Sequence, residues 1–280
     1  MLKLTNISQL VSYQSASDTI QTMSNIEILI EKETIQEIGP TVNNADEIVD
    51  CSGRLVTPGF VDPHTHPVFY KGREEEYTMR LAGASYQEIA KNGGGILSSI
   101  KDVRNASEDD LVELVKKRMT RFIKLGTTTI EAKSGYGLDT ESELKSLRVL
   151  NRVNCDHPID IIPTFLGAHA FPPEFSDDPD GYVDLLCDEM IPAVGEQGIA
   201  QYCDVFCEKG YFSVEQSRRI LETGKTYGLI PRLHADEFED SGAAELAAEV
   251  GAVSADHLMA VSNAGISALK NGAVTATLLP

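Results

Sequence analysis

The chain has 280 residues and a formal net charge of −19 at neutral pH, because 43 acidic side chains outnumber 24 basic ones. This charge repels the phosphates of nucleic acids and of anionic membranes, so neither is expected as a partner. No apolar run approaches the roughly 20 residues of a membrane-spanning helix, and the first residues do not resemble a secretory signal. The five scattered cysteines, an odd number, indicate reduced thiols and a cytoplasmic location.

The first 58 residues are expected to form a small β subdomain, as one half of a β-sandwich. Apolar and polar residues alternate from Ile26 to Ile30, which predicts two short strands within residues 25–39, around a turn near Lys32. A third strand is expected in the segment EIVDCSG. Pro58-Gly59 then marks a junction, so a second domain is expected over residues 59–280.

From residue 60 onward, strand-like and helix-like segments alternate strictly. Such alternation predicts a parallel sheet with right-handed crossovers, and seven strands favour a TIM-type (β/α)8 barrel over an open sheet. Because the seventh strand is directly followed by the last residue, we expect a barrel truncated after strand seven and a partial sequence. The expected strands are Phe60–Thr65, Thr127–Ala132, Ile159–Leu166, Cys203–Cys207, Ile230–His234, Val253–His257 and Val274–Leu278.

Three of the helical segments begin with a pattern that resembles a capping box. The pattern pairs a hydroxyl side chain with an acid or amide three residues later, which satisfies the free N–H groups of the first helical turn. We therefore predict helix starts at Ser107, Thr140 and Ser213.

The segment PGFVDPHTHP carries the clearest chemical signal. His64 and His66 are two residues apart at the end of the first barrel strand, so both side chains leave the same face. Neutral imidazoles that converge from one face suit a transition metal. Barrel enzymes place their chemistry at this end of the strands. We therefore predict a metal site here, in preference to two surface or capping histidines.

Further histidines stand at the ends of other predicted strands. His234 ends the fifth strand and can supply a third imidazole, while Glu237 could accept a proton from an activated water instead of merely capping a helix. His257 ends the sixth strand and could be a fourth ligand or could orient the water. His169 ends the third strand and faces the same rim. An ordinary buried histidine is the alternative for His257 and for His169.

Several stretches together resemble the amidohydrolase superfamily and, within it, the imidazolonepropionase family. They include PGFVDPHTHPVF, GREEEYTMRLAG, YQEIAKNGGGI, GTTTIEAKSGYGLD, PTFLGAHAFPPEF, CDVFCEKGYFS, LHADEF and SADHL. The resemblance implies that one zinc or iron(III) ion, without an organic cofactor, is bound by His64, His66 and His234. It also implies that Glu237 is the acid/base group and that His257 helps to position the attacking water.

The implied reaction is the hydrolysis of a C–N bond in a cyclic amide, 4-imidazolone-5-propanoate, to give N-formimidoyl-L-glutamate in the third step of histidine degradation. Arg73 offers bidentate recognition of the substrate carboxylate, although it could also be a surface residue of GREEEY. Tyr136 lies in the loop SGYGLD after the second strand, where barrel active sites are built. The resemblance also implies substrate contacts by His169, Glu237 and, more weakly, Tyr86, and it suggests a homodimer.

The chain departs from the family pattern at the eighth barrel strand, from which amidohydrolases take an aspartate ligand. We therefore expect the 280 residues alone to show little turnover and weak metal retention. The alternatives are a two-metal enzyme like dihydroorotase or hydantoinase, a guanine deaminase-like enzyme, and an inactive metal-binding remnant. The first alternative requires a bridging lysine on strand four, and Lys209 lies just past that strand.

Overall fold

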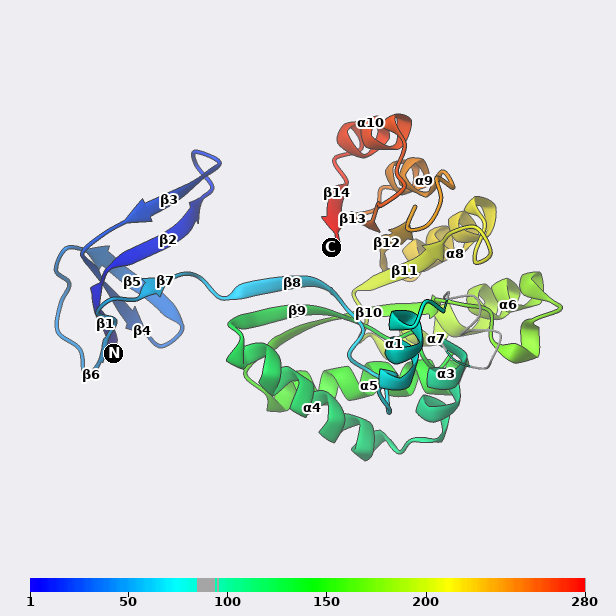
Figure 1. Ribbon diagram of the computed structural model, residues 1–280, viewed down its shortest axis with the longest axis horizontal. Coiled ribbons are helices and arrows are strands. Elements are labelled where there is room, and N and C mark those ends of the chain that lie inside the picture. Colours follow the sequence, from blue (N-terminus) through cyan, green and yellow to red (C-terminus); the bar gives the residue numbers. More distant parts are fainter. Residues whose placement is uncertain (85–93, 95, 280) are drawn as a thin grey trace. The chain divides into compact units, whose positions relative to one another are not determined.

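The computed structural model describes residues 1–84, 94 and 96–279, so the predicted contact residue Tyr86 lies outside the described residues. The chain divides into two compact units, Met1–Phe60 and Val61–Pro280 (Figure 1). Each unit has its own buried apolar cluster.

The first unit consists of short strands in two sheets. One sheet has the order β5-β4-β1-β6 and the other β3-β2-β7. The two strands predicted around Lys32 are β4 and β5, and the predicted third strand contains β6. The sequence analysis assigned no strands to the first 24 residues, where β1 to β3 lie. The strands are β1 (Leu2–Ile7), β2 (Gln9–Gln14), β3 (Thr19–Met23), β4 (Ile26–Glu31), β5 (Thr34–Gly39), β6 (Glu47–Asp50) and β7 (Leu55–Val56).

The second unit is built on one seven-stranded sheet whose order follows the sequence, β14-β13-β12-β11-β10-β9-β8. All seven predicted strands are present, and their ends lie within two residues of the predicted ones. The pairs from β9 to β14 are parallel. The strands are β8 (Phe60–Thr65), β9 (Thr127–Lys133), β10 (Asp160–Ala168), β11 (Tyr202–Cys207), β12 (Ile230–Ala235), β13 (Ser254–His257) and β14 (Thr275–Leu278).

This sheet curls into a nearly closed barrel. Strands β8 and β13 stand far apart in the strand order, yet His64 Nδ1 of β8 lies 2.7 Å from Asp256 Oδ2 of β13. In the same way, Arg232 of β12 donates to the carbonyl of Pro63 at 2.8 Å. Side chains of distant strands therefore meet across the interior, and the predicted TIM-type architecture is confirmed through its seventh strand.

Helices follow the strands of the second unit and cover the outer face of the curved sheet (Figure 1). Among the described residues, no helix combines the length and the apolar composition that crossing a bilayer requires. The helices are α1 (Glu74–Leu81), α3 (Ile96–Asn105), α4 (Glu108–Lys124), α5 (Thr140–Asp156), η1 (Pro173–Phe175), α6 (Pro179–Leu185), η2 (Leu186–Met190), α7 (Ile191–Gln197), α8 (Val214–Thr226), α9 (Ala243–Glu249) and α10 (Asn263–Asn271).

The three predicted helix starts are confirmed, because α4, α5 and α8 begin within one residue of Ser107, Thr140 and Ser213. Ser107 caps α4, and Ser213 forms a complete capping box with Gln216 at the start of α8. The predicted capping box at Thr140 is wrong, because Thr140 is the first helical residue and α5 is capped by Asp139, whose side chain accepts a hydrogen bond from the N–H of Ser142. Glu143 does not bond back to the helix start, since its carboxylate turns toward the loop before α5.

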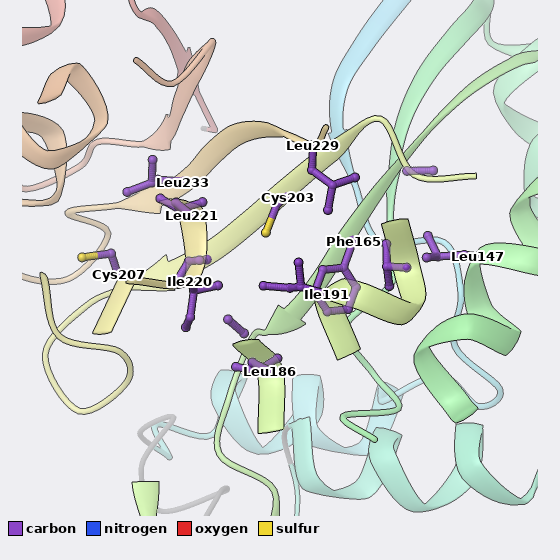
Figure 2. Packing of buried hydrophobic residues seen from close by; sticks show 14 of the residues in the cluster. Leu147, Phe165, Leu186, Ile191, Cys203, Cys207, Ile220, Leu221, Leu229 and Leu233 are labelled. Carbon is purple, nitrogen blue, oxygen red and sulfur yellow. The ribbon is translucent and has the colours of Figure 1, made fainter. Parts of the chain in front are cut away.

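The main core lies between the outer face of the sheet and the helices. Figure 2 shows Phe165 of β10 and Cys203 of β11 in the same cluster as Leu147 of α5, Ile191 of α7 and Leu221 of α8. Burial of such side chains is the main favourable contribution to folding. The core therefore fixes the strands, and with them the positions of the residues at the strand ends.

Candidate metal centre and active site

Four histidine side chains come together at the carboxyl end of the barrel strands. His64 and His66 leave the end of β8, while His234 and His257 leave the ends of β12 and β13. The Nε2 atom of His66 lies 3.1 Å from that of His64 and 3.3 Å from that of His234. The ring centroid of His257 is 5.1 Å from those of His64 and His234. The structure therefore brings the three predicted ligands together around one point.

Buried carboxylates orient two of these rings. His64 Nδ1 lies 2.7 Å from Asp256 Oδ2, and His234 Nδ1 lies 3.1 Å from Asp204 Oδ1. A carboxylate at Nδ1 favours the proton on that atom and leaves the Nε2 lone pair free. Burial lowers the pKa of His234 to about 3 and that of His66 well below its usual value. Neutral imidazoles whose lone pairs converge suit a bound cation, so the donor set fits a transition metal.

His169 lies directly beside this cluster, after the last residue of β10. Its ring stacks on that of His66 with a centroid distance of 5.0 Å. Its Nδ1 lies 2.9 Å from the carbonyl oxygen of Gly135. The ligand atoms of His66, His169 and His234 lie within 4.8 Å of one another, as do those of His64, His234 and His257. His169 and His257 therefore flank the predicted ligands on two sides.

Glu237 and His257 form a pair at the rim of the barrel. The carboxylate Oε2 of Glu237 lies 3.6 Å from Nε2 of His257. Burial and the nearby charge of Glu208 raise the pKa of Glu237 to about 7, so its carboxyl can hold or release a proton near neutral pH. The backbone turns sharply here, since His257 and Leu258 have φ values of 77° and 58°. Left-handed backbone at two such residues is uncommon and clusters at functional sites.

A cavity of about 320 Å³ opens above the histidines. Arg73 directly precedes α1, and Arg80 lies seven residues further on, two turns along the same side of that helix. The sequence analysis named Arg73 but missed Arg80, although this spacing could have revealed it. The aromatic residues Phe206, Tyr211 and Phe238 were also missed. The lining residues are His66, Arg73, Arg80, Ile96, Tyr136, His169, Phe206, Tyr211, His234, Glu237, Phe238 and His257.

The loop that carries Tyr136 is held from both sides. The carboxylate of Glu143, which is fully buried, accepts hydrogen bonds from the N–H groups of Gly135, Gly137 and Leu138 at 2.8–2.9 Å. Arg104 donates to the carbonyls of Gly137 and Leu138 at 2.7 and 3.2 Å. Gly135 is required here, because its φ is 102° and a Cβ would lie 2.9 Å from the carbonyl oxygen of Leu166. The loop therefore presents Tyr136 to the cavity on a fixed backbone.

Replacing Glu143 with glutamine is expected to destabilise the fold and to raise KM more than it lowers kcat. The amide replaces one carboxylate oxygen by an NH2 group, which is a donor and cannot accept where it faces a buried N–H of the loop, at a cost of about 1–3 kcal/mol per unpaired group. Urea unfolding of the full-length protein and steady-state kinetics measure the two effects. Glu141→Gln is the matched control, because Glu141 lies exposed on the same helix and bonds Arg148. Equal stability and equal KM in the two variants would contradict the proposal that Glu143 fixes the loop that carries Tyr136.

Beneath the histidines, the barrel interior contains buried charges that the sequence analysis did not single out. They are Glu131 and Lys133 of β9, Asp204 of β11, Arg232 of β12 and Asp256 of β13. Only Asp204 stands within an otherwise apolar strand, YCDVFC, and that is the signal by which the sequence could have revealed it.

The chain was compared with known proteins by sequence and by fold. No family model matches it. It is 51% identical over 267 residues to imidazolonepropionase of Geobacillus kaustophilus, which is 92% of this chain and 63% of that protein. It is 54% identical over 232 residues to imidazolonepropionase of Shouchella clausii, which is 83% of this chain and 52% of that protein. The chain thus spans about half to two thirds of the length of these curated relatives.

Solved structures share the fold. A 5-methylcytosine deaminase from Klebsiella pneumoniae, liganded with phosphonocytosine, matches 98% of this chain and 65% of its own, with a TM-score of 0.68 at 19% identity. A mutant atrazine chlorohydrolase from Arthrobacter aurescens TC1, complexed with zinc and atraton, matches all of this chain and 65% of its own, with a TM-score of 0.64 at 13% identity. The chain is therefore similar in sequence to imidazolonepropionases over most of its own length, and it shares its fold with these solved structures.

Proposed function

We propose that the protein hydrolyses 4-imidazolone-5-propanoate to N-formimidoyl-L-glutamate, as the third step of histidine degradation. One observation carries the proposal: the Nε2 atoms of His64, His66 and His234 converge at the floor of a cavity that also carries Glu237 and two arginines. A metal-dependent hydrolase could accept several substrates. The sequence identity of 51% and 54% with two imidazolonepropionases favours this one.

One zinc or iron(III) ion would be held by His64, His66 and His234. Their three imidazole side chains and the carboxylates behind two of them fit such an ion. When bound, it would lower the pKa of a water molecule strongly, toward about 7. No organic cofactor is required for the hydrolysis of an amide.

Glu237 is assigned the proton transfers. Its carboxylate would take a proton from the attacking water and deliver it to the ring nitrogen that departs when the cyclic amide opens. A pKa of about 7 allows both steps at neutral pH, because neither the acid nor the carboxylate is strongly disfavoured. His257, 3.6 Å away, would position the water and stabilise the charge that develops on the ring carbonyl oxygen.

Arg73 and Arg80 would bind the propanoate carboxylate of the substrate. Two guanidinium groups on the cavity wall provide a local positive field in a chain of net charge −19. Tyr136 and His169 would contact the imidazolone ring, since both line the cavity beside the predicted ligands.

The organisation of the protein follows from the same proposal. Residues 1–58 would be the small β subdomain, and residues 59–280 would contribute barrel strands one to seven of the catalytic domain. A metabolic enzyme of this kind would work in the cytoplasm as a homodimer. Sedimentation of the full-length protein tests the homodimer, and a monomer at micromolar concentration would contradict it.

The test is a substrate panel on the full-length protein loaded with zinc. Mass spectrometry should show conversion of 4-imidazolone-5-propanoate to N-formimidoyl-L-glutamate, and no turnover of dihydroorotate, hydantoin or guanine. Turnover of any of these three without turnover of the imidazolone would replace the proposal by that alternative. Bound metal without turnover of any of the four would favour a metal-binding protein.

A further inference from the structure

The buried charges beneath the histidines form one connected network. Lys133 Nζ lies 2.9 Å from Glu131 Oε1, 2.7 Å from Asp204 Oδ2 and 3.7 Å from Asp256 Oδ2. The side chains of Lys133, Asp204 and Asp256 are completely buried. Arg232 is a second cation beside Asp256, at 2.9 Å. Lys133 forms ion pairs with both aspartates, at 2.7 and 3.7 Å.

These aspartates are the groups that orient two metal-ligand histidines. Asp204 Oδ1 accepts from the backbone N–H of His234 at 3.1 Å and lies 3.1 Å from its Nδ1, while Oδ2 of the same carboxylate faces Lys133. Asp256 Oδ2 lies 2.7 Å from His64 Nδ1. One ammonium group thus faces both carboxylates: Oδ2 of Asp204, which is the oxygen not used by His234, and, at 3.7 Å, the same Oδ2 of Asp256 that lies against His64 Nδ1. A displacement of Lys133 would therefore change the orientation of His64 on β8 and of His234 on β12 together.

We propose that Lys133 is a positioning residue of the metal centre, which holds Asp204 and Asp256 in place so that His64 and His234 present Nε2 to the same ion. This inference rests on the metal site of the proposed function. It assigns to the second barrel strand a role in metal binding, although that strand supplies no ligand.

The reason lies in the cost of burying like charges. Two carboxylates in a dry interior repel each other and lose hydration, and a cation between them offsets both effects. Without the ammonium group, the two carboxylates would repel each other and turn apart. The hydrogen bonds at Nδ1 of both rings are then weakened, and the lone pairs at Nε2 are no longer held toward a common point.

The experiment uses the full-length protein, stripped of metal, and the variant Lys133→Met. Zinc affinity is measured by competition with a chromophoric chelator, and histidine tautomers are read from long-range ¹H–¹⁵N spectra of the metal-free protein. We expect a loss of roughly 10- to 100-fold in zinc affinity, the range known for residues behind metal ligands. We also expect the Nδ1–H signals of His64 and His234 to give way to mixed tautomers.

Lys3→Met is the matched control, because Lys3 is also buried and pairs with Glu27 at 2.7 Å, but in the other unit. Its zinc affinity should equal that of the wild type. If Lys133→Met does not fold, Lys133→Gln takes its place, since glutamine keeps a donor toward Asp204 and lacks the charge. An unchanged zinc affinity and unchanged tautomers in a folded Lys133 variant would overturn the inference.

Both readouts are independent of the substrate. A protein that does not open the imidazolone ring, yet loses zinc affinity with Lys133→Met, would refute the proposed function and support the role of Lys133. A protein that hydrolyses the imidazolone, and binds zinc equally well with Lys133→Met, would refute only the role of Lys133.

Discussion

Replacing Glu237 with glutamine is expected to lower kcat for the imidazolone by roughly 100- to 10,000-fold, the range of general acid–base catalysis. Glutamine keeps the shape of the side chain but neither accepts nor releases a proton at neutral pH. Because Glu237 is not among the three converging Nε2 ligands, the metal content should not change. Steady-state kinetics and elemental analysis of the same preparation measure both quantities.

The matched control is Glu239→Gln. Glu239 lies two residues further along the chain, is exposed and pairs with Lys209 at 2.7 Å on the surface. Surface ion pairs contribute about 0–1 kcal/mol, so this variant should behave as the wild type in kinetics and stability. A Glu237→Gln enzyme with near-normal kcat would remove Glu237 from the mechanism, whatever its metal content.

Replacing His66 with asparagine is expected to abolish turnover together with metal binding. The Nε2 atom of His66 lies between those of His64 and His234, at 3.1 and 3.3 Å, so it is the central member of the predicted ligand set. Asparagine is shorter and offers an amide oxygen, which is a poor substitute for imidazole toward zinc. Elemental analysis should show a fall from about one metal ion per chain to nearly none.

His157→Asn provides the control for this variant. His157 follows α5 at the surface and bonds Thr120 at 3.2 Å, far in sequence from every predicted ligand. Its metal content and kcat should be unchanged. Full metal occupancy in folded His66→Asn protein would mean that another set, such as His64, His234 and His257, holds the ion.

The barrel strands could be predicted from the sequence because strand-like segments alternate strictly with helical segments whose starts carry capping signals. His64 and His66 could be placed on one face from the two-residue period of a strand, and His234 and His257 from their positions at strand ends. These are local patterns. The convergence of the four rings then followed from the rule that parallel barrel strands end at one rim.

Long-range pairing could not be predicted in the same way. Nothing near Lys133 in sequence shows that Asp204, 71 residues later, accepts its hydrogen bond. Glu143 has the spacing of a capping-box acid. Its carboxylate instead accepts hydrogen bonds from three N–H groups of the loop before α5, so it does not bond the start of the helix. Strand β3 is exposed along most of its length, and β2 buries only Leu10, so neither shows the alternation that marked β4.

The central claim is that His64, His66 and His234 hold one catalytic metal ion. Anomalous diffraction at the zinc absorption edge, from crystals of the full-length protein, tests it directly. The account predicts a single strong peak in contact with Nε2 of all three histidines and beside the cavity that carries Glu237. A peak bound elsewhere, or none in crystals of a protein that still hydrolyses the imidazolone, would contradict the account.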